Sequence, residues 1–575
     1  MEQIKTGYPS VDRPWLAYYP ADAAFEKADK DTLYSFVTKR NQDNLAGIAL
    51  DYFGTKITYG QLFSEINAAA KSFVSLCVKP GDIVSLVVLS SPQAFIAIYA
   101  LNKIGAVANI IEPRTNAAQI IDRINATKSE VSLIVENIYE KIKDEMPRCS
   151  ARDVIVYSLA DSMRRGMKLA YCAKYGRSKV PCSRHLIGWK SFMALGACAD
   201  AVPPVPFAEK SPAVIVYTGG TTGMAKGAVL PNEAFTLMHY CKAVCDPPFE
   251  RGQTFLGIMP PFIAYGMMFG FFMALSFGCT VAIVPVFEPA KFDSLILKYR
   301  PNHFFGVPSF FEGLTSGKLM KKADLSCIRG IITGGDYMSP QTEMKINAFL
   351  ASHNCSAKIY KGYGMTELSS AAVYTGCEKS NVPGSIGIPL VLNQVKIIHP
   401  ESGKELPYGE HGELCISSPT MMLGYYNNPA ETDEIIRYDE NGVAWVHTQD
   451  IGYMKEDGTL YIIGRRKRMI VRPDGHNVWP SVIENIINMH DSVSSCAVVG
   501  LPNPAGDSGR IPTAFVELRP NVKQSNEQIA EQLDAMCRKA LPERDIPWAY
   551  RFCKQLPLSS VGKIDYRKLE ELANI

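Results

Sequence analysis

With 575 residues, the chain is long enough for several domains of ordinary size. Its composition, 47% hydrophobic and 20% charged residues, is typical of a globular protein and excludes an intrinsically disordered one. The net charge of +3 is close to neutral for this length, so we expect no nucleic acid partner.

The distribution of cysteine and of apolar residues favours a cytoplasmic protein. The fifteen cysteines are scattered and form no CxxC pair, which predicts reduced thiols, and the polar N-terminal residues resemble no signal peptide. The segment Thr254–Phe287 carries no charge and is long enough to span a bilayer. Because Pro260, Pro261, Pro285 and several glycines interrupt it, we expect a buried core segment instead.

The first half of the chain alternates strand-like and helix-like patterns. Thr58 and Gln61 have capping-box spacing before an amphipathic stretch that runs to Leu76. An apolar run at 83–89 is followed by a helix pattern that starts after Ser91-Pro92. Strand-like runs follow at 106–113, 131–137, 279–287 and 328–335. This order predicts parallel sheets with right-handed crossovers.

Residues 161–190 differ from the rest, with eight Lys or Arg and one acidic residue. Met163, Met167, Leu169 and Tyr171 are interleaved without clear helical periodicity, which favours an irregular, solvated surface insertion. The alternative is an anionic contact, with a lipid surface or with a CoA phosphate.

The strongest local motif is the glycine-rich turn after the apolar run 214–217. It comprises Thr218, Gly219, Gly220, Thr221, Thr222, Gly223 and, three residues on, Lys226. Glycines allow close backbone approach, hydroxyl and N–H groups donate, and the lysine supplies charge, as phosphate binding requires. The spacing is not that of a Walker A loop.

Three further motifs follow in the chain. In KGYGMTELSS (361–370), Tyr363 offers a flat face to a base, and Thr366 and Glu367 offer oxygen ligands of the kind Mg²⁺ takes beside phosphates. Asp450 ends an extended segment, where a carboxylate could hold ribose hydroxyls. Near the C-terminus, Lys563 follows a glycine. Each motif alone is weak, since turns, capping carboxylates and exposed lysines are common.

Together and in this order, the motifs resemble the superfamily of acyl- and aryl-CoA synthetases, peptide-synthetase adenylation domains and firefly-type luciferases. The resemblance extends from about Thr58 to Leu569, and the phosphate loop is most similar to that of bacterial long-chain fatty-acyl-CoA ligases. It implies an α/β fold: a large N-terminal domain (1–464) of parallel-rich sheets flanked by helices plus a distorted barrel, and a small mobile α+β C-terminal domain (465–575).

The resemblance also implies roles. The loop from Thr218 to Lys226 would hold the β- and γ-phosphates of ATP, and Glu367 would bind Mg²⁺. Adenine, the α-phosphate and the ribose would be held by Gly334, Gly335, Asp336, Tyr363, Gly364, Thr366, Asp450, Ile462 and Arg465. Lys563 would bridge the substrate carboxylate and the α-phosphate. For the second half-reaction, the small domain would rotate about Lys467 and bring the loop around Gly475 to the CoA thiol.

Four positions depart from the family pattern. Ala225 replaces a proline of the phosphate loop, and Ile263 replaces a histidine linked to substrate gating. Gln449 replaces the glycine of a TGD motif, which puts the local backbone geometry in question. Arg468 stands where an aspartate is common near the hinge.

The acyl pocket would include Phe262, Tyr265, Gly266, Met267 and Gly335. Amino-acid-activating relatives carry an aspartate in this segment, and here there is none, so an ammonium would be buried unpaired. Gly266 and Gly270 would leave room, and methionines suit an adaptable pocket. We therefore expect a medium- or long-chain fatty acid, with an aryl acid next.

The leading hypothesis is an AMP-forming acyl-CoA ligase that uses ATP, Mg²⁺ and CoA. The alternatives are an acyl-AMP ligase that loads a carrier protein, a luciferase-like oxygenase and a catalytically silent nucleotide-binding scaffold. Intact Lys226, Glu367, Asp450 and Lys563 argue against the last. A cytoplasmic enzyme is expected, with peripheral membrane contact through 161–190 as an open alternative.

Overall fold

The computed structural model describes residues 5–23, 27–176, 185–218, 225–315, 317–474, 477–502, 509–520, 522–558 and 564–573. The chain divides into two compact units. The large unit comprises Trp15–Gln394 and Ile416–Val446, and the small unit comprises Met1–Pro14, Val395–Cys415 and His447–Ile575. The expected domain boundary between residues 464 and 465 falls within the small unit and stays a prediction.

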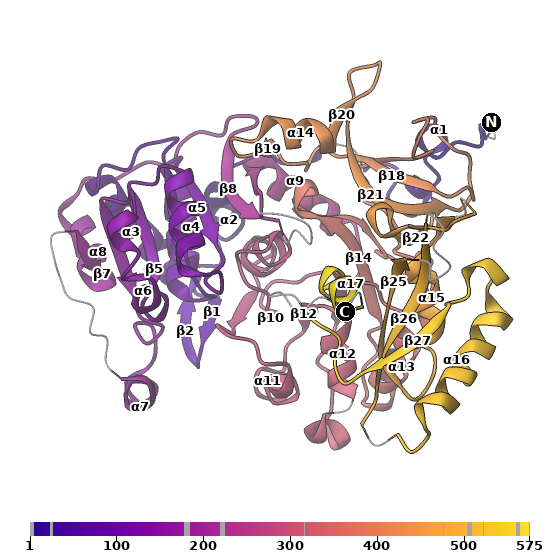
Figure 1. The fold of residues 1–575 in the computed structure, drawn as a ribbon. Coiled ribbons are helices and arrows are strands. Elements are labelled where there is room, and N and C mark those ends of the chain that lie inside the picture. Colours follow the sequence, from indigo (N-terminus) through magenta and orange to yellow (C-terminus); the bar gives the residue numbers. More distant parts are fainter. Residues whose placement is uncertain are drawn as a thin grey trace. The chain divides into compact units, whose positions relative to one another are not determined.

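Two largely parallel sheets form the large unit, as the strand-helix alternation predicts (Figure 1). In the described residues the first has eight strands, in the order β19 (Gly424–Tyr425), β9 (Gly227–Pro231), β8 (Pro212–Tyr217), β4 (Val107–Ile111), β3 (Ile83–Val87), β5 (Val131–Val135), β6 (Asp153–Tyr157) and β7 (Leu186–Gly188). The second has nine, in the order β16 (Ile388–Pro389), β15 (Ser370–Tyr374), β14 (Ile359–Met365), β13 (Gly330–Gly334), β12 (His303–Gly306), β10 (Thr254–Gly257), β11 (Thr280–Ile283), β1 (Ile48–Tyr52) and β2 (Thr55–Thr58). Strands β3 to β8 pair in parallel in the first sheet, and β1 and β10 to β14 do so in the second.

Helices cover these sheets and form the core with them. Helix α4 packs against β4, α6 against β5 and β6, and α8 against β6 and β7 (Figure 1). Every residue of α4 is buried, which explains why its sequence is largely apolar. The helices of the large unit are α2 (Leu33–Arg40), α3 (Tyr59–Ser75), α4 (Pro92–Lys103), α5 (Ala117–Ala126), α6 (Glu136–Ile142), α7 (Arg165–Tyr175), α8 (Trp189–Leu195), α9 (Asn232–Ala243), α10 (Ala274–Ser276), α11 (Phe292–Tyr299), α12 (Pro308–Thr315), α13 (Pro340–Ser352) and α14 (Pro429–Ile435).

The helix starts predicted from capping residues are confirmed. Thr58 and Gln61 form a reciprocal capping box at the start of α3. Ser91 caps α4 by accepting the N–H of Ala94, and Pro92 occupies the first helical position. These starts depend on contacts within one helical turn, and so they can be predicted from the sequence.

The uncharged segment 254–287 is largely buried core, as expected, although Val286 near its end is exposed. It is divided into β10, the π-helical segment η5 (Gly266–Met273), α10 and β11, and every residue of η5 is buried. No helix in the described part of the chain is long and apolar enough to cross a membrane. No disulfide joins the cysteines in that part either.

The prediction of an irregular stretch at 161–190 is wrong for Arg165–Tyr175, which forms helix α7 (Figure 1). None of its residues is buried, so burial imposes no apolar periodicity that the sequence could display. The helix is built from good helix formers such as Met167, Lys168 and Leu169. The expectation of a surface-exposed segment is confirmed for this helix.

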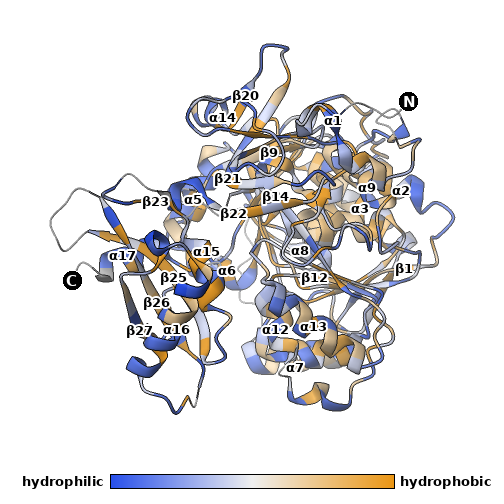
Figure 2. Ribbon diagram, turned by 90° about the vertical axis from the view of Figure 1, so that its right-hand side faces the viewer, coloured by the Kyte–Doolittle hydropathy of each residue, from blue (hydrophilic) through white to orange (hydrophobic). Residues whose placement is uncertain are grey.

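The small unit contains a three-stranded sheet, β25 (Val493–Pro502), β26 (Arg510–Leu518) and β27 (Ala549–Cys553). Helices α15 (Pro480–Ile487) and α16 (Asn526–Ala540) share one hydrophobic cluster with these strands, and α17 (Tyr566–Ala573) contributes Leu569 to a second. In Figure 2 the strands are mostly hydrophobic in colour and α16 is largely hydrophilic, as its exposed face requires. This confirms the α+β character of the C-terminal region.

In the described part of the chain, a five-stranded sheet holds the segment around Asp450. Its path is β17 (Gln394–Ile398), β18 (Gly412–Ser417), β21 (Ala444–Met454) and β20 (Ile436–Tyr438), and β22 (Leu460–Arg465) pairs with β21. In this sheet β20 and β22 both pair antiparallel with β21. The short ribbon of β23 (Ile470–Val471) and β24 (Asn477–Val478) follows, and the small unit also contains α1 (Pro9–Asp12).

Candidate active site

The glycine-rich turn connects two antiparallel strands of the large unit, β8 and β9. The Thr218 N–H donates to the Lys226 carbonyl (2.9 Å), and the Lys226 N–H donates to Thr218 Oγ1 (3.3 Å). These two bonds close the base of the turn. Gly219, Gly220, Thr221, Thr222 and Gly223 lie outside the described residues.

The Lys226 ammonium has two neighbours that sequence reasoning missed. It forms an ion pair with the Glu431 carboxylate of α14, and it lies over the Tyr425 ring, 5.1 Å from the ring centroid. Tyr425 lies on β19, where it pairs with Ala228 of β9, and the helix that carries Glu431 follows this strand in the chain. The Tyr425 N–H also donates to Thr432 Oγ1 (2.9 Å), which ties α14 to this strand.

Glu367 is a buried carboxylate that contacts the same tyrosine. The Tyr425 hydroxyl donates to Glu367 Oε1 at 2.5 Å, and Glu367 is 7% exposed. Burial, and then the nearby Glu367 carboxylate, raise the pKa of Tyr425, so the phenol stays protonated as a donor. Within the described residues, no lysine or arginine forms an ion pair with Glu367. A buried carboxylate without a cationic partner fits a Mg²⁺ ligand.

The turn that carries Thr366 and Glu367 has a tightly constrained backbone. It lies between β14 and β15, with Ser369 at φ 56° and Ser370 at φ 129°. A Cβ atom on Gly364 would lie 1.7 Å from the Ser370 carbonyl oxygen, so only glycine fits at this position. Tyr363 precedes it on β14 and is half-buried.

The predicted nucleotide residues 334–336 lie at the carboxyl end of β13, whose last residue is Gly334. Gly334 pairs with Gly362 of the neighbouring parallel strand β14, which brings this segment close to the YGMTE motif. Gly335 has φ 78°, and Asp336 is exposed. In parallel sheets, ligands bind at the carboxyl ends of the strands, which is where these residues lie.

The predicted acyl residues lie on and just before η5. Tyr265 is placed at β13 by its hydroxyl, which donates to the Ile332 carbonyl (3.2 Å), and Phe262 and Met267 are buried. A Cβ on Gly266 would lie 1.9 Å from the Pro260 carbonyl oxygen, and one on Gly270 would lie 3.3 Å from the Met259 oxygen. The two glycines therefore make room for neighbouring backbone, and not for a substrate as the sequence suggested.

Asp450 and Arg465 face each other across β21 and β22 in the small unit. The Arg465 Nε lies 2.8 Å from the Asp450 Oδ1, with the aspartate buried and the arginine side chain 60% exposed. Ile462, on the same strand as Arg465, is half-buried opposite Gly452. The family resemblance implied that Asp450 and Arg465 act together, and the structure brings these two residues into contact.

Gln449 adopts the backbone conformation that a glycine would favour. Its φ is 59°, in the left-handed region, and its N–H donates to Glu413 Oε1 (3.2 Å). At this position of β21 the chain therefore keeps the left-handed backbone conformation without the glycine of TGD, and a side chain stands in a strained conformation.

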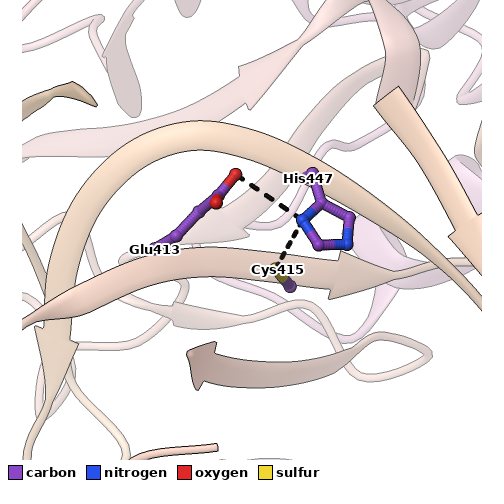
Figure 3. Close-up of side chains that lie close together, drawn as sticks. All are labelled: Glu413, Cys415 and His447. Atoms are coloured by element: carbon purple, nitrogen blue, oxygen red, sulfur yellow. Dashed lines mark hydrogen bonds and ion pairs between the residues drawn. The ribbon is translucent and has the colours of Figure 1, made fainter. Parts of the chain in front are cut away.

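Glu413, Cys415 and His447 form a compact cluster between β18 and β21 (Figure 3). The His447 Nδ1 lies 3.6 Å from the Cys415 Sγ and 3.7 Å from the Glu413 Oε1. Burial by itself would raise the pKa of Glu413, but His447, the Gln449 N–H and Arg466 lower it. The Gln449 N–H and the Arg466 guanidinium donate hydrogen bonds to the buried carboxylate, and the cluster thereby fixes the backbone beside Asp450.

The expected hinge residue Lys467 lies in the 3₁₀ turn η9 (Arg466–Arg468) and is exposed. Arg468, the departure from the family pattern, forms an ion pair with Glu484 of α15 (2.5 Å) and stacks over the Tyr566 ring (3.6 Å). These two partners of Arg468, Glu484 and Tyr566, both belong to the small unit. Gly475 and Lys563 lie outside the described residues.

Comparison with known proteins agrees with this fold. Residues 37–426 match the family model described as AMP-binding enzyme, and residues 482–563 match its C-terminal domain model. A long-chain-fatty-acid–CoA ligase of Bacillus subtilis is 27% identical over 97% of this chain and 98% of its own length. A probable 4-coumarate–CoA ligase of Dictyostelium discoideum is 29% identical over 88% of each chain. ATP-bound MatB from Rhodopseudomonas palustris superposes with a TM-score of 0.80 at 22% identity, covering 94% of this chain and 98% of MatB.

The chain belongs to the AMP-binding enzyme family, since the family model covers more than half of it. It is therefore an adenylate-forming enzyme of the acyl- and aryl-CoA ligase class, for which ATP, Mg²⁺ and CoA are the standard reactants. The expected α/β class and family are confirmed.

Proposed function

We propose that this enzyme converts a medium- or long-chain fatty acid to its acyl-CoA. In the first step, a substrate carboxylate oxygen attacks the α-phosphorus of ATP, and pyrophosphate leaves. In the second step, the CoA thiol attacks the acyl carbonyl, gives up its proton, and AMP leaves. The protein contributes mainly by positioning the reactants and by neutralising the charge that develops on the phosphoryl oxygens.

The arrangement of Lys226, Tyr425 and Glu367 is the observation that carries this proposal. A lysine suited to phosphate and a buried carboxylate suited to Mg²⁺ both contact one tyrosine. We assign the β- and γ-phosphates to Lys226 and the turn that it closes, and the metal to Glu367. The α-phosphate is assigned to Thr366, the adenine to Tyr363 and the crevice at 334–336, and the ribose to Asp450, Ile462 and Arg465.

The apolar character of the pocket segment supports a fatty acid. Residues Gly266–Met273 are all buried, and the uncharged run 254–287 offers no carboxylate for a substrate ammonium. The fatty-acid assignment agrees with the name of the Bacillus subtilis relative, whereas the Dictyostelium relative keeps an aryl acid as the second candidate.

A substrate panel tests the proposal. The enzyme is incubated with ATP, Mg²⁺ and CoA and with fatty acids of 8 to about 18 carbons, cinnamic-type acids, malonate or amino acids, and the acyl-CoA product is read by mass spectrometry. We expect fatty acids to have the highest kcat/KM. Preference for amino acids by more than about tenfold would contradict the pocket argument, since a buried ammonium would be unpaired. Acylation of a carrier protein but not of CoA would contradict the assigned acceptor.

We further propose that α7 contacts anionic membrane surfaces. Its exposed apolar side chains, Met167, Leu169 and Tyr175, lie among Arg164, Arg165, Lys168 and Lys174. Basic residues beside exposed apolar ones are typical of peripheral lipid contact. The chain should sediment with phosphatidylserine vesicles at low salt, and replacing Leu169 and Lys168 by glutamine should weaken this. Equal sedimentation of both proteins would contradict the proposal.

A further inference from the structure

The Lys226 ammonium, which the proposed function assigns to the β- and γ-phosphates of ATP, forms an ion pair with the Glu431 carboxylate. The Lys226 side chain is 32% exposed and that of Glu431 is 40% exposed, so solvent and ligand can reach both. The carboxylate of Glu431 therefore lies where an anionic ligand of Lys226 would approach.

The position of Glu431 is set by local structure and does not depend on a long flexible connection. Strand β19 pairs with β9, and the Tyr426 N–H donates to the carbonyl of Gly227, the residue after Lys226 (2.7 Å). Helix α14 begins at Pro429, with the Asn428 side chain accepting the Glu431 N–H. Thr432 then ties the helix back to Tyr425. Glu431 is thus held in the first turn of a capped helix, facing the lysine.

We propose that Glu431 is an internal competitor that nucleotide phosphate must displace from Lys226. This inference rests on the proposed function. In the nucleotide-free enzyme the ammonium is neutralised by Glu431. Phosphate oxygens that approach Lys226 meet repulsion from this carboxylate until it moves away. Partly exposed ion pairs contribute little to stability, so the exchange is easy for a polyanion.

The competition also affects ATP and AMP differently. ATP reaches Lys226 through its β- and γ-phosphates and can replace the carboxylate. AMP has neither phosphate, so it cannot compete for Lys226, and Glu431 returns to the lysine when pyrophosphate has left. Glu431 therefore lowers the affinity for ATP, which must displace it from Lys226, and leaves the affinity for AMP unchanged.

Nucleotide binding to variants in which one glutamate is replaced by uncharged glutamine tests the proposed role of Glu431. Glu431→Gln is compared with Glu434→Gln, which removes the same charge from an exposed position on the same helix. Dissociation constants for ATP and for AMP are measured by calorimetry without acid or CoA, in Mg²⁺. We expect Glu431→Gln to bind ATP about two- to fivefold more tightly than wild type. A partly exposed ion pair contributes up to about 1 kcal/mol, and removing it changes the dissociation constant by about this factor. AMP affinity should not change, and Glu434→Gln should behave as wild type.

Three results would overturn the inference: ATP affinity of Glu431→Gln equal to that of Glu434→Gln, weaker ATP binding by Glu431→Gln, or equal tightening for ATP and AMP. Both variants keep their fold if their thermal midpoints match wild type, and the exposed positions make this the expected result. If wild type itself binds no ATP, the proposed function fails. If wild type binds ATP and forms acyl-CoA while the variants are alike, only the role of Glu431 fails.

Discussion

Two buried histidines, His239 and His303, make the large unit sensitive to acid. Burial lowers the pKa of each to about 3, aided by Arg40 and Lys242 near His239 and by Lys242 and Arg329 near His303. Both are therefore neutral in the folded protein at pH 6, whereas the unfolded chain binds protons below about 6.5. Their contribution to stability is complete above pH 6.5 and is lost as pH falls toward 3, at up to about 1.4 kcal/mol per pH unit for each histidine.

His303→Asn tests this dependence by its slope. Urea unfolding of wild type and variant is followed between pH 7.5 and 5.5. We expect the variant to lose about 1 kcal/mol less over this interval, even if it is less stable at pH 7.5. His185→Asn, at an exposed histidine, serves as the control and should follow wild type. Parallel curves for wild type and His303→Asn would contradict the assignment.

At the scale of elements, η5 depends on a close approach to the backbone at 259–260. Gly266→Ala would place a methyl group 1.9 Å from the Pro260 carbonyl oxygen, so the segment would have to shift. We expect a loss of several kcal/mol, measured as a lower urea midpoint. Gly313→Ala is the control, because it lies in helix α12 with no atom within 4 Å of its Cβ position. It should stabilise by up to about 1 kcal/mol. A Gly266→Ala protein as stable as wild type would show that the segment can adjust.

The elements also show how far the sequence predicts this protein. The starts of α3 and α4 follow from Thr58 and Ser91, because capping is a contact within one turn. Helix α7 has no buried face, and so no periodicity indicates it. The phosphate turn and Glu367 are recognisable as contiguous motifs. Tyr425 and Glu431 are not, because they reach Lys226 only through the pairing of β19 with β9, some two hundred residues apart in sequence.

At the scale of the whole molecule, we propose that residues 465–575 can fold alone. As far as the structure describes the chain, both hydrophobic clusters of this region lie between Ile470 and Leu569 and include no residue from before the predicted boundary. A fragment 465–575 should therefore give a cooperative thermal transition by circular dichroism. A fragment without a cooperative transition would place the boundary elsewhere, for instance ahead of β22.

Lys563 is expected to act in only one of the two half-reactions. The resemblance gives Lys563 a role only in adenylate formation, where it neutralises charge between the carboxylate and the α-phosphate. We expect Lys563→Ala to slow acid-dependent ATP–pyrophosphate exchange by about 10²- to 10³-fold, as for loss of one charge-stabilising donor. Transfer of the acyl group from supplied acyl-AMP to CoA should stay within about threefold of wild type. Lys554→Ala, at an exposed lysine of the same region, should leave both steps unchanged. Single-turnover measurements separate the two steps. An equal loss of rate in both steps would show that Lys563 does not act in adenylate formation alone. That result would remove the basis for domain rotation about Lys467.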